Sequence, residues 1–558
     1  MKFKGNNVPQ AQNVYDDKAK NHVDAKVNRA GGLSYSLDSA TKLLTMTGGQ
    51  FFNEPSYYTD DKVGVDGLTE LARDVVDTAK AVTASGNPND ILSIAHWLRV
   101  EKNIRTTPAV LYAIAAGQEQ NRNRMVEYGP KILKRPDDVM QAFVAYFGLY
   151  GSFTTKVGKD NVSRVVREAT MPNSFKKGLA AAIAQFDEYQ LLKYENNEFP
   201  RWKDVLQMVY RKNGYPVKKE LLTYFLTGNM VDPAATPILA ARKELAKVKT
   251  WNSNVPALAK KAHIQWDQLL SQFGNTKAVW EAMVDGGKAT LPVMAAVRNL
   301  RNMEQAGISD AHWRKLTSMV LNHEDNKMMP FRFVSARKHV SNQAAKSLVD
   351  ALLDKASQNL ADLPGVTLIV VDHSGSMDTK ISDKSEMTKK EAGTALAAVL
   401  AKKLGNRAIV AAFGSTFATV EFSTQDSTWR IYEEIMKVGR GVGYSTEAYL
   451  TFEYLLAKRI KVDRVILLSD MQCYERGGYG NRSFAANYER YRKEVNNNAK
   501  LVSVDIGGYG DSTVAKDKNV YLSTGFTESI VNEIVQFEGL AQAEVSTTPS
   551  LDYVRANY

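Results

Sequence analysis

The chain is poor in the residues that build disulfides, thiolate metal centres and membrane spans. Its 558 residues include a single cysteine, Cys473, which excludes an internal disulfide and a cysteine-based metal site. No apolar run approaches the ~18 residues of a membrane-spanning helix. The polar residues 1–7 lack the apolar core of a signal peptide. We therefore expect a protein of the reducing cytoplasm that has no membrane partner.

Motifs of the common enzyme classes are also missing. The 7 histidines are scattered, and no His-Glu-x-x-His helix is present. The phosphate-loop pattern fails at Gly287-Lys288, because Ala289 follows and the upstream glycine is lacking. We expect no catalytic residues and a protein that is not an enzyme. A metal-dependent phosphoryl-transfer site at Asp372 and Ser374 is the enzymatic alternative.

Positive charge is in excess, and it is unevenly distributed. A chain of this length exceeds what one core usually holds, so two or more domains are expected. Residues 361–558 carry 23 Lys and Arg against 25 Asp and Glu, whereas residues 1–360 carry 49 against 36. The net charges are therefore −2 and +13, which add to the formal +11 of the chain. A basic region of this kind suggests a polyanionic partner.

The first two-thirds of the sequence predict helix after helix. Between Gly67 and Lys355, apolar residues recur at helical spacing, and short breaks carry Pro, Gly or Asn. The predicted helices span 68–80, 90–98, 108–117, 137–150, 174–194, 202–212, 217–227, 235–247, 275–284, 291–304, 310–321 and 341–357. Almost no strand pattern intervenes. Such paired helices indicate divergent HEAT-like repeats stacked as an α-solenoid, with a compact all-helical domain as the alternative.

After residue 364 the pattern changes to alternating strands and helices. Strands are predicted at 365–371, 407–413, 417–422, 463–469, 500–506 and near 519–522, and helices at 386–404, 427–437, 446–458, 484–496 and 527–540. This alternation predicts a doubly wound parallel sheet. We expect a multidomain chain with a helical domain at 1–360, an α/β domain at 361–540 and an irregular tail at 541–558. Residues 475–481 read as a flexible insertion.

Oxygen-bearing side chains follow the strands of the α/β domain. The first strand ends in Asp372-x-Ser374-x-Ser376, a later strand ends in Asp470, and Thr446 follows a glycine-containing loop. Ligands of open α/β sheets bind at the carboxyl ends of the strands. Carboxylates and hydroxyls are hard ligands that suit Mg²⁺ or Mn²⁺ better than zinc. A strand-to-turn cap without metal is the alternative for the serine-containing motif alone.

This order of motifs resembles the metal-ion-dependent adhesion site of von Willebrand factor type A domains. The resemblance implies Ser374, Ser376 and Thr446 as ligands of a divalent metal, directly or through water. It implies that Asp372 and Asp470 contact the metal or its bound water. In related domains an acidic side chain of a partner fills an open coordination position. A protein partner at this site, for example an exoribonuclease, is therefore one of our expectations.

The helical region resembles TROVE-domain proteins, the Ro autoantigen family of RNA-binding rings. The resemblance rests on residues 44–58, 101–113, 174–184 and 291–303, the last of which (LPVMAAVRNLRNM) is close to the family's hallmark and is followed by MPFRFV at 329–334. Family members append a von Willebrand factor type A domain, so the order matches across nearly the whole chain. The resemblance implies a closed ring whose basic hole admits single-stranded 3′ ends of misfolded or unprocessed RNA. It also implies an outer basic surface for a structured Y RNA.

The candidate RNA-binding residues are mostly basic and lie near the predicted helix ends: Lys131, Lys134, Arg135, Lys176, Lys177, Arg201, Trp202 and Lys203. The Trp202 side chain has two alternative roles, stacking on an RNA base or packing in the core. Relatives place polar or basic groups where this chain has Ala180, Ala181 and Trp202, so we expect altered recognition of a Y-type RNA. Arg298 and Arg301 of the hallmark either line the hole or brace helix ends.

Together these features predict a ribonucleoprotein component that acts in RNA quality control or processing. It would bind single-stranded RNA 3′ ends, and a Y-type RNA on its outer surface. The alternative is a metal-dependent protein-adhesion scaffold with incidental RNA affinity.

Overall fold

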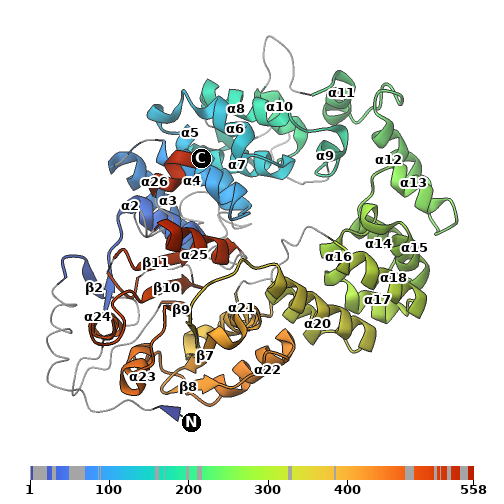
Figure 1. Ribbon diagram of the computed structural model, residues 1–558. Helices are drawn as coiled ribbons and strands as arrows, with labels where there is room; N and C mark the ends of the chain where they lie inside the picture. Colours follow the sequence, from blue (N-terminus) through green and yellow to red (C-terminus); the bar gives the residue numbers. More distant parts are fainter. Residues whose placement is uncertain are drawn as a thin grey trace. The chain divides into compact units, whose positions relative to one another are not determined.

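The computed structural model divides into two compact units, and its elements are labelled in Figure 1. It describes residues 2–3, 22–27, 33–48, 70–85, 87, 89–157, 163–168, 170–195, 200–209, 217–323, 330–381, 385–471, 483–507, 512–515, 517–524, 529–540 and 551–558. The helical unit comprises Glu54–Met319 and Val554–Tyr558, and the sheet unit comprises Met1–Asn53 and Val320–Tyr553. In these ranges no helix has both the length and the low polarity that a bilayer span requires.

The helical unit is built of short amphipathic helices, as the sequence predicts. Its elements are α3 (Glu70–Ser85), α4 (Asp90–Val100), α5 (Thr106–Ala116), η3 (Glu119–Asn121), α6 (Met125–Ile132), α7 (Pro136–Tyr150), α8 (Asn173–Ile183), α9 (Glu188–Leu192), α10 (Trp202–Val209), α11 (Lys219–Thr227), α12 (Pro237–Lys247), α13 (Val255–Lys261), α14 (Trp266–Phe273), α15 (Lys277–Asp285), η4 (Gly287–Ala289), α16 (Val293–Arg298), α17 (Leu300–Ala306) and most of α18 (Asp310–Leu321). The prediction of a mostly helical region is confirmed.

Two predicted helices are each broken in the structure. The expected helix at 174–194 is α8 followed by α9, because the Asp187 side chain accepts a hydrogen bond from Gln190 N at 2.7 Å and starts a new helix. The expected helix at 291–304 divides at Asn299 into α16 and α17. The sequence did not predict α6, α13 or α14.

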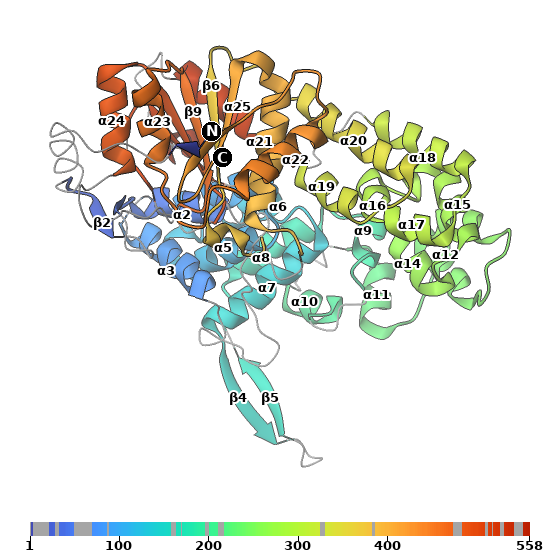
Figure 2. The same ribbon diagram turned by 90° about the horizontal axis from the view of Figure 1, so that it is seen from below.

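A β-hairpin interrupts the helices, contrary to the prediction that almost no strands intervene. Strands β4 (Ser152–Val157) and β5 (Ser163–Glu168) pair antiparallel, with Lys156 opposite Arg164. Both strands contain Thr or Val, whose β-branched side chains favour extended backbone. Figure 2 shows the hairpin projecting away from the helices of its unit.

Two glycines let α6 and α8 approach each other closely. A Cβ atom on Gly178 would lie 1.8 Å from Tyr112 Oη and 2.5 Å from Met125 O, and one on Gly129 would lie 2.5 Å from Gly178 O. At the far end of the pair, Gln185 Nε2 donates to Leu133 O at 2.7 Å. The two helices, with the residues just after them, are therefore in contact from Met125 to Leu133 of one and from Gly178 to Gln185 of the other.

The sheet unit contains a seven-stranded sheet in the order β1-β8-β7-β6-β9-β10-β11. The strands are β1 (Lys2–Phe3), β6 (Thr367–Asp372), β7 (Ala408–Phe413), β8 (Phe417–Val420), β9 (Arg464–Ser469), β10 (Lys500–Asp505) and β11 (Val520–Thr524). Five neighbouring strands, β7, β6, β9, β10 and β11, are parallel, which confirms the predicted doubly wound sheet. At one edge β8 pairs antiparallel with β7 on one side and with β1 on the other. The edge strand β1 was not predicted. A separate hairpin pairs β2 (Ala25–Val27) with β3 (Leu33–Tyr35).

Helices cover both faces of this sheet. They are α2 (Ser39–Gly48), α21 (Lys389–Leu404), α22 (Thr428–Gly439), α23 (Leu450–Lys458), α24 (Phe484–Glu494) and α25 (Ser529–Leu540). Helix α19 (Pro330–Lys338) packs against α20 (Gln343–Gln358) and α21, and α20 packs against α21 and α22. Leu368 and Val370 join the cluster formed with Phe452 of α23, whereas Val371 approaches Gly393 of α21 on the opposite face. Burial on both faces explains why β6 reads as a continuous apolar run.

The tail beyond residue 541 differs from the irregular segment that the sequence predicts. Residues Leu551–Asn557 form helix α26. The proposed insertion at 475–481, the 49–58 part of the first TROVE-like stretch and residues 210–212 of a predicted helix lie outside the described residues.

Candidate functional site

Two fully buried carboxylates meet where β6 and β9 end. The two strands are parallel neighbours with Val371 opposite Leu468, so Asp372 ends one strand while Asp470 directly follows the other. Both aspartates are 0% exposed. Ser469 Oγ donates to Asp372 Oδ2 at 2.6 Å, which holds the two strand ends together.

The two serines of the motif direct their hydroxyls to one place. Ser374 N donates to Asp372 Oδ1 at 2.8 Å, and this turn leads into η5 (Gly375–Asp378). Ser374 Oγ and Ser376 Oγ are 3.2 Å apart. Adjacent ligands of an octahedral Mg²⁺ ion, each ~2.1 Å from the metal, lie about 3 Å apart. The hydroxyl pair therefore has the spacing of two neighbouring metal ligands.

The loop that carries Thr446 lies against the serine motif. Gly375 N donates to Tyr444 O at 2.9 Å, and Glu447 N donates to Gly414 O at 3.2 Å. Thr446 itself is 9% exposed. Helix α23 begins only at Leu450, four residues later than predicted, because the backbone around Glu447 bonds to the loop after β7 instead of starting a helix.

The electrostatics of the strand ends favour a bound cation. Burial, and then the charge of Asp470, raise the pKa of Asp372 to about 7. Lys389 Nζ, on a side chain that is 8% exposed, lies 3.6 Å from Asp470 Oδ2. Within the described ranges no three His, Cys, Asp or Glu residues are grouped to hold a metal. A metal at this place would therefore depend on hydroxyl oxygens as well as on the two carboxylates, and the observed donor set fits that requirement.

Four of the candidate RNA-binding lysines lie on or just after the two helices that cross at Gly129 and Gly178. Lys131 is in α6, Lys134 follows it, and Lys176 and Lys177 are in α8. Lys134 and Lys177 are exposed. Lys131 Nζ is 2.7 Å from Glu127 Oε1 and lies 4.9 Å from the centre of the Tyr128 ring. The close approach of α6 and α8 therefore places these lysines on adjoining helices.

The structure does not support a surface role for Trp202. Its side chain is 2% exposed, and its Nε1 donates to Leu191 O at 2.9 Å. A buried indole with its N–H satisfied packs in the core, so the prediction that Trp202 binds RNA by stacking on a base is wrong and core packing is the role observed. Arg201 and Lys203 lie beside it at the start of α10, where Arg201 N donates to Asp204 Oδ2 at 2.8 Å.

A group of cations around Tyr194 was not predicted as a unit, although Arg135 was a candidate. Arg135 Nη2 donates to Tyr194 Oη at 2.7 Å, and the Arg135 and Lys193 cations lie 5.9 and 5.8 Å from the centre of the Tyr194 ring. Burial, and then the charge of Arg135, lower the pKa of Lys193. Arg105 contributes to this lowering, while Asp137 and Asp267 oppose it.

Arg298 extends this group towards the hallmark motif. Burial, and then the charge of Arg105, lower the pKa of Arg298, which is the last residue of α16. We call Arg105, Arg135, Lys193 and Arg298 the arginine–lysine cluster. Its members lie up to 193 positions apart in the sequence (298 − 105), so no local pattern reveals it. Arg301 is exposed on α17.

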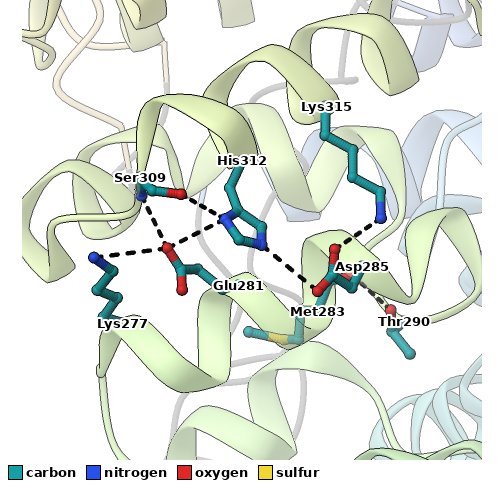
Figure 3. Close-up of polar contacts among 8 residues, drawn as sticks. All are labelled: Lys277, Glu281, Met283, Asp285, Thr290, Ser309, His312 and Lys315. Atoms are coloured by element: carbon teal, nitrogen blue, oxygen red, sulfur yellow. Dashed lines mark hydrogen bonds and ion pairs between the residues drawn. The ribbon is translucent and has the colours of Figure 1, made fainter.

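A second polar network joins α15 to α18, as Figure 3 shows. His312 Nδ1 lies 2.7 Å from Ser309 Oγ and 3.2 Å from Glu281 Oε1, while Nε2 lies 3.5 Å from Asp285 Oδ2. The order serine–histidine–aspartate resembles a hydrolase triad. However, the Asp285 side chain is 57% exposed and also binds Lys315 Nζ at 2.7 Å, whereas a triad carboxylate is buried behind its histidine. We interpret the network as a set of polar contacts that stabilises the packing of α15 against α18.

Comparisons with known proteins agree with both units. The sequence profile of the TROVE domain matches residues 38–236 and 250–409, and that of the Ro60 von Willebrand factor type A domain matches residues 367–538. The solved structure of the Deinococcus radiodurans RO (RSR) protein has a TM-score of 0.60 and 15% identity, covering 90% of this chain and 100% of that one. That likeness shows a shared fold.

Two curated relatives match part of the chain. Telomerase protein component 1 of Mus musculus is 26% identical over 336 residues, and the Rattus norvegicus protein of that name is 24% identical over the same length. Each match covers 51% of this chain but only 12% of the relative. Because the TROVE profile matches more than half of the 558 residues, the chain belongs to the TROVE-domain family.

Proposed function

We propose that this chain is the RNA-binding subunit of a ribonucleoprotein and that its helical unit binds single-stranded RNA 3′ ends. The observation that carries the proposal is the arginine–lysine cluster. Arg135 and Lys193 lie against the Tyr194 ring, and the charge of Arg105 acts on both Lys193 and Arg298. Arg135 is ion-paired with Asp137 at 2.5 Å, and the charges of Asp137 and Asp267 also act on Lys193. Like charges repel, and Asp137 offsets only part of this repulsion, so a bound anion would lower the energy of the cluster further.

RNA suits this site better than a small anion. A chain of phosphates neutralises several cations at once and releases counterions, and an aromatic ring offers a stacking surface for a base. Tyr194 is half-buried beneath two of the cations, so an incoming base would meet the ring where phosphates meet the charges. The net charge of +13 over residues 1–360 supports the same class of ligand. The mouse and rat relatives are named as protein components of telomerase, which is in keeping with a subunit of a larger assembly.

Charge reversal tests this assignment. The double variant Lys193→Glu/Arg298→Glu should weaken binding of a labelled single-stranded RNA about equally for all sequences, since phosphate contacts carry no base information. The slope of log affinity against log salt should fall by roughly 0.7 for each lost contact. The matched control is Lys260→Glu/Lys261→Glu, which changes the same charge on exposed residues of α13. If the two variants lose equal RNA affinity, the effect is one of net charge and the cluster is not a specific RNA site.

For the outer surface we propose that Lys131, Lys134, Lys176 and Lys177 contact a structured RNA, with Arg201 and Lys203 at its margin. The support is that α6 and α8 pack with little space between them, and these two helices and the residue after α6 carry the four lysines. Charge reversal at Lys176 and Lys177 should weaken the binding of a stem-loop RNA more than the binding of an unstructured RNA. If binding of the unstructured RNA is weakened more, these residues do not belong to the outer RNA surface.

A second function is proposed for the sheet unit, because two buried carboxylates and a pair of neighbouring serine hydroxyls lie at and just after its strand ends. Ser374, Ser376 and Thr446, with Asp372 and Asp470, would hold Mg²⁺ or Mn²⁺, and the metal would offer an open position to an acidic side chain of a protein partner. Ser376→Ala should remove the stabilisation by added Mn²⁺ in a thermal melt. Thr379→Ala, a nearby exposed hydroxyl, is the control, and a Mn²⁺ response that survives in Ser376→Ala contradicts the assignment.

A further inference from the structure

The last residues of helix α26 belong to the helical unit and dock there through a bidentate ion pair. Figure 1 draws α26 beside α4. Arg555 Nε lies 2.7 Å from Asp90 Oδ1, and Arg555 Nη2 lies 2.8 Å from Asp90 Oδ2. Asp90 is 1% exposed, and Val554 next to the arginine is fully buried. A buried carboxylate that receives both nitrogens of a guanidinium fork is a specific recognition site for arginine.

Tyr558 completes the docking with contacts at both ends of the residue. Its main-chain oxygen accepts a hydrogen bond from Tyr128 Oη at 2.9 Å and lies 3.4 Å from His96 Nδ1. Its hydroxyl donates to Glu101 Oε1 at 2.6 Å, and its ring packs edge-on against the His96 ring with centroids 5.3 Å apart. The main-chain oxygen and the hydroxyl of Tyr558 therefore both contact polar groups of the α4–α6 region.

The spacing of the two anchors fits a helical segment. Arg555 and Tyr558 are three residues apart, which places them on one side of a helix. Asp90 and Glu101 lie at opposite ends of α4 and supply the two carboxylates. The α4–α6 face thus binds an Arg-x-x-Tyr segment through two acidic residues: Asp90 binds the arginine, and Glu101 binds the tyrosine.

The docked segment adjoins two of the lysines proposed to contact RNA. Tyr128 binds Tyr558 through its hydroxyl while its ring lies 4.9 Å from Lys131 Nζ. His96, the other contact of the same oxygen, has its pKa lowered by burial and, to a smaller extent, by the charges of Lys131 and Lys134. The groups that hold Tyr558 and the groups that would hold a phosphate are therefore the same or adjacent.

We infer that residues 555–558 are a docked ligand of the α4–α6 face and that a structured RNA bound on this face displaces them. The inference rests on the proposed outer RNA surface. A phosphate oxygen is an acceptor for Tyr128 and His96, as is the main-chain oxygen of Tyr558, so the two compete for the same donors. The segment therefore reduces the apparent affinity for RNA in proportion to how firmly it is docked.

Replacement of Arg555 separates competition from simple electrostatics because the two predict opposite signs. Arg555→Met removes a positive charge, which by itself weakens RNA binding, yet it undocks the segment, which should tighten binding of a labelled stem-loop RNA several-fold. Tyr558→Phe leaves the charge unchanged and should shift the affinity in the same direction. The matched control is Arg314→Met, which removes an exposed arginine of α18 in the same unit. Weaker or unchanged binding by Arg555→Met overturns the inference.

Hydrogen exchange of the full chain keeps this result distinct from a failure of the proposed function. Exchange in residues 551–558 should be faster in Arg555→Met than in Arg314→Met, and RNA should accelerate it in the wild type. If RNA binds and leaves the exchange unchanged, displacement is refuted while RNA binding stands. If none of the proteins binds RNA, the proposed function falls and the competition falls with it, and the exchange rates alone then decide whether the segment docks.

Discussion

Lys389 should weaken metal binding at the strand ends, and its removal should strengthen it. The ammonium group lies 3.6 Å from Asp470 Oδ2, and both side chains are buried. Without a metal, this cation neutralises part of the charge of Asp470. A divalent ion that binds Asp470 must approach the ammonium or drive it away. Lys389→Met keeps the length of the apolar stem and removes only the competing charge.

The size of the effect follows from the geometry. At 3.6 Å and an effective dielectric constant of ~20, the attraction between Lys389 and Asp470 is at most about 5 kcal/mol. Desolvation of both groups offsets most of this, which leaves ~1–2 kcal/mol and a change of about 5- to 30-fold in metal affinity. The apo variant should also melt at a lower temperature, because Asp470 then lacks this nearby cation in a buried site.

Calorimetric titration with Mn²⁺ of the wild type, Lys389→Met and Lys390→Met measures the effect. Lys390 is the neighbouring lysine, and its Nζ lies 2.6 Å from Asp378 Oδ1, a largely exposed carboxylate. Its replacement should alter the affinity by less than that of Lys389. If Lys389→Met binds Mn²⁺ no more tightly than Lys390→Met does, the ammonium does not compete with the metal.

Three further predictions concern the helical unit. Burial raises the pKa of Asp138 to about 7, above its unfolded value, so wild-type stability should fall as pH rises from about 4 to 7, by at most ~1.4 kcal/mol per pH unit. Asp138→Asn should lack this slope, and parallel melting curves across that range would refute it. Gly178→Ala should lower the free energy of unfolding by roughly 1–3 kcal/mol, since the added Cβ meets Tyr112 and backbone, whereas Gly228→Ala should cost only ~1 kcal/mol because its positive φ is strained but its surroundings are open. Trp202→Phe should lose roughly 1–3 kcal/mol of stability, from the missing hydrogen bond and the smaller ring in a buried site, while RNA affinity stays unchanged, and a loss of affinity in a folded variant would restore the stacking role.

The sheet and its strand ends could be predicted from the sequence because their signals are local. A strand buried on both faces is a continuous apolar run, so β6 and β9 were found to within two residues of their ends. The aspartates that follow such strands necessarily gather at one edge of a parallel sheet. The direction of Lys389 could not be predicted, because a lysine at the start of a helix usually faces solvent.

Contacts between distant segments account for what the sequence did not reveal. Arg105, Lys193 and Arg298 come together only through the packing of several helices, and none stands in a basic run. The burial of Trp202 depends on α9, whose Leu191 carbonyl accepts its N–H, and the sequence had predicted one longer helix there. The β4–β5 hairpin was missed because two six-residue strands between long helical patterns carry little weight.

The most direct test of the central claim is a competition between RNA duplexes that differ only in their ends. The full chain, bound to a labelled single-stranded RNA, is titrated with a blunt duplex, the same duplex with a 3′ overhang, and the same duplex with a 5′ overhang. We predict that the 3′ overhang competes best and that Lys193→Glu/Arg298→Glu abolishes its advantage. Equal competition by all three duplexes would contradict the binding of RNA 3′ ends by the helical unit.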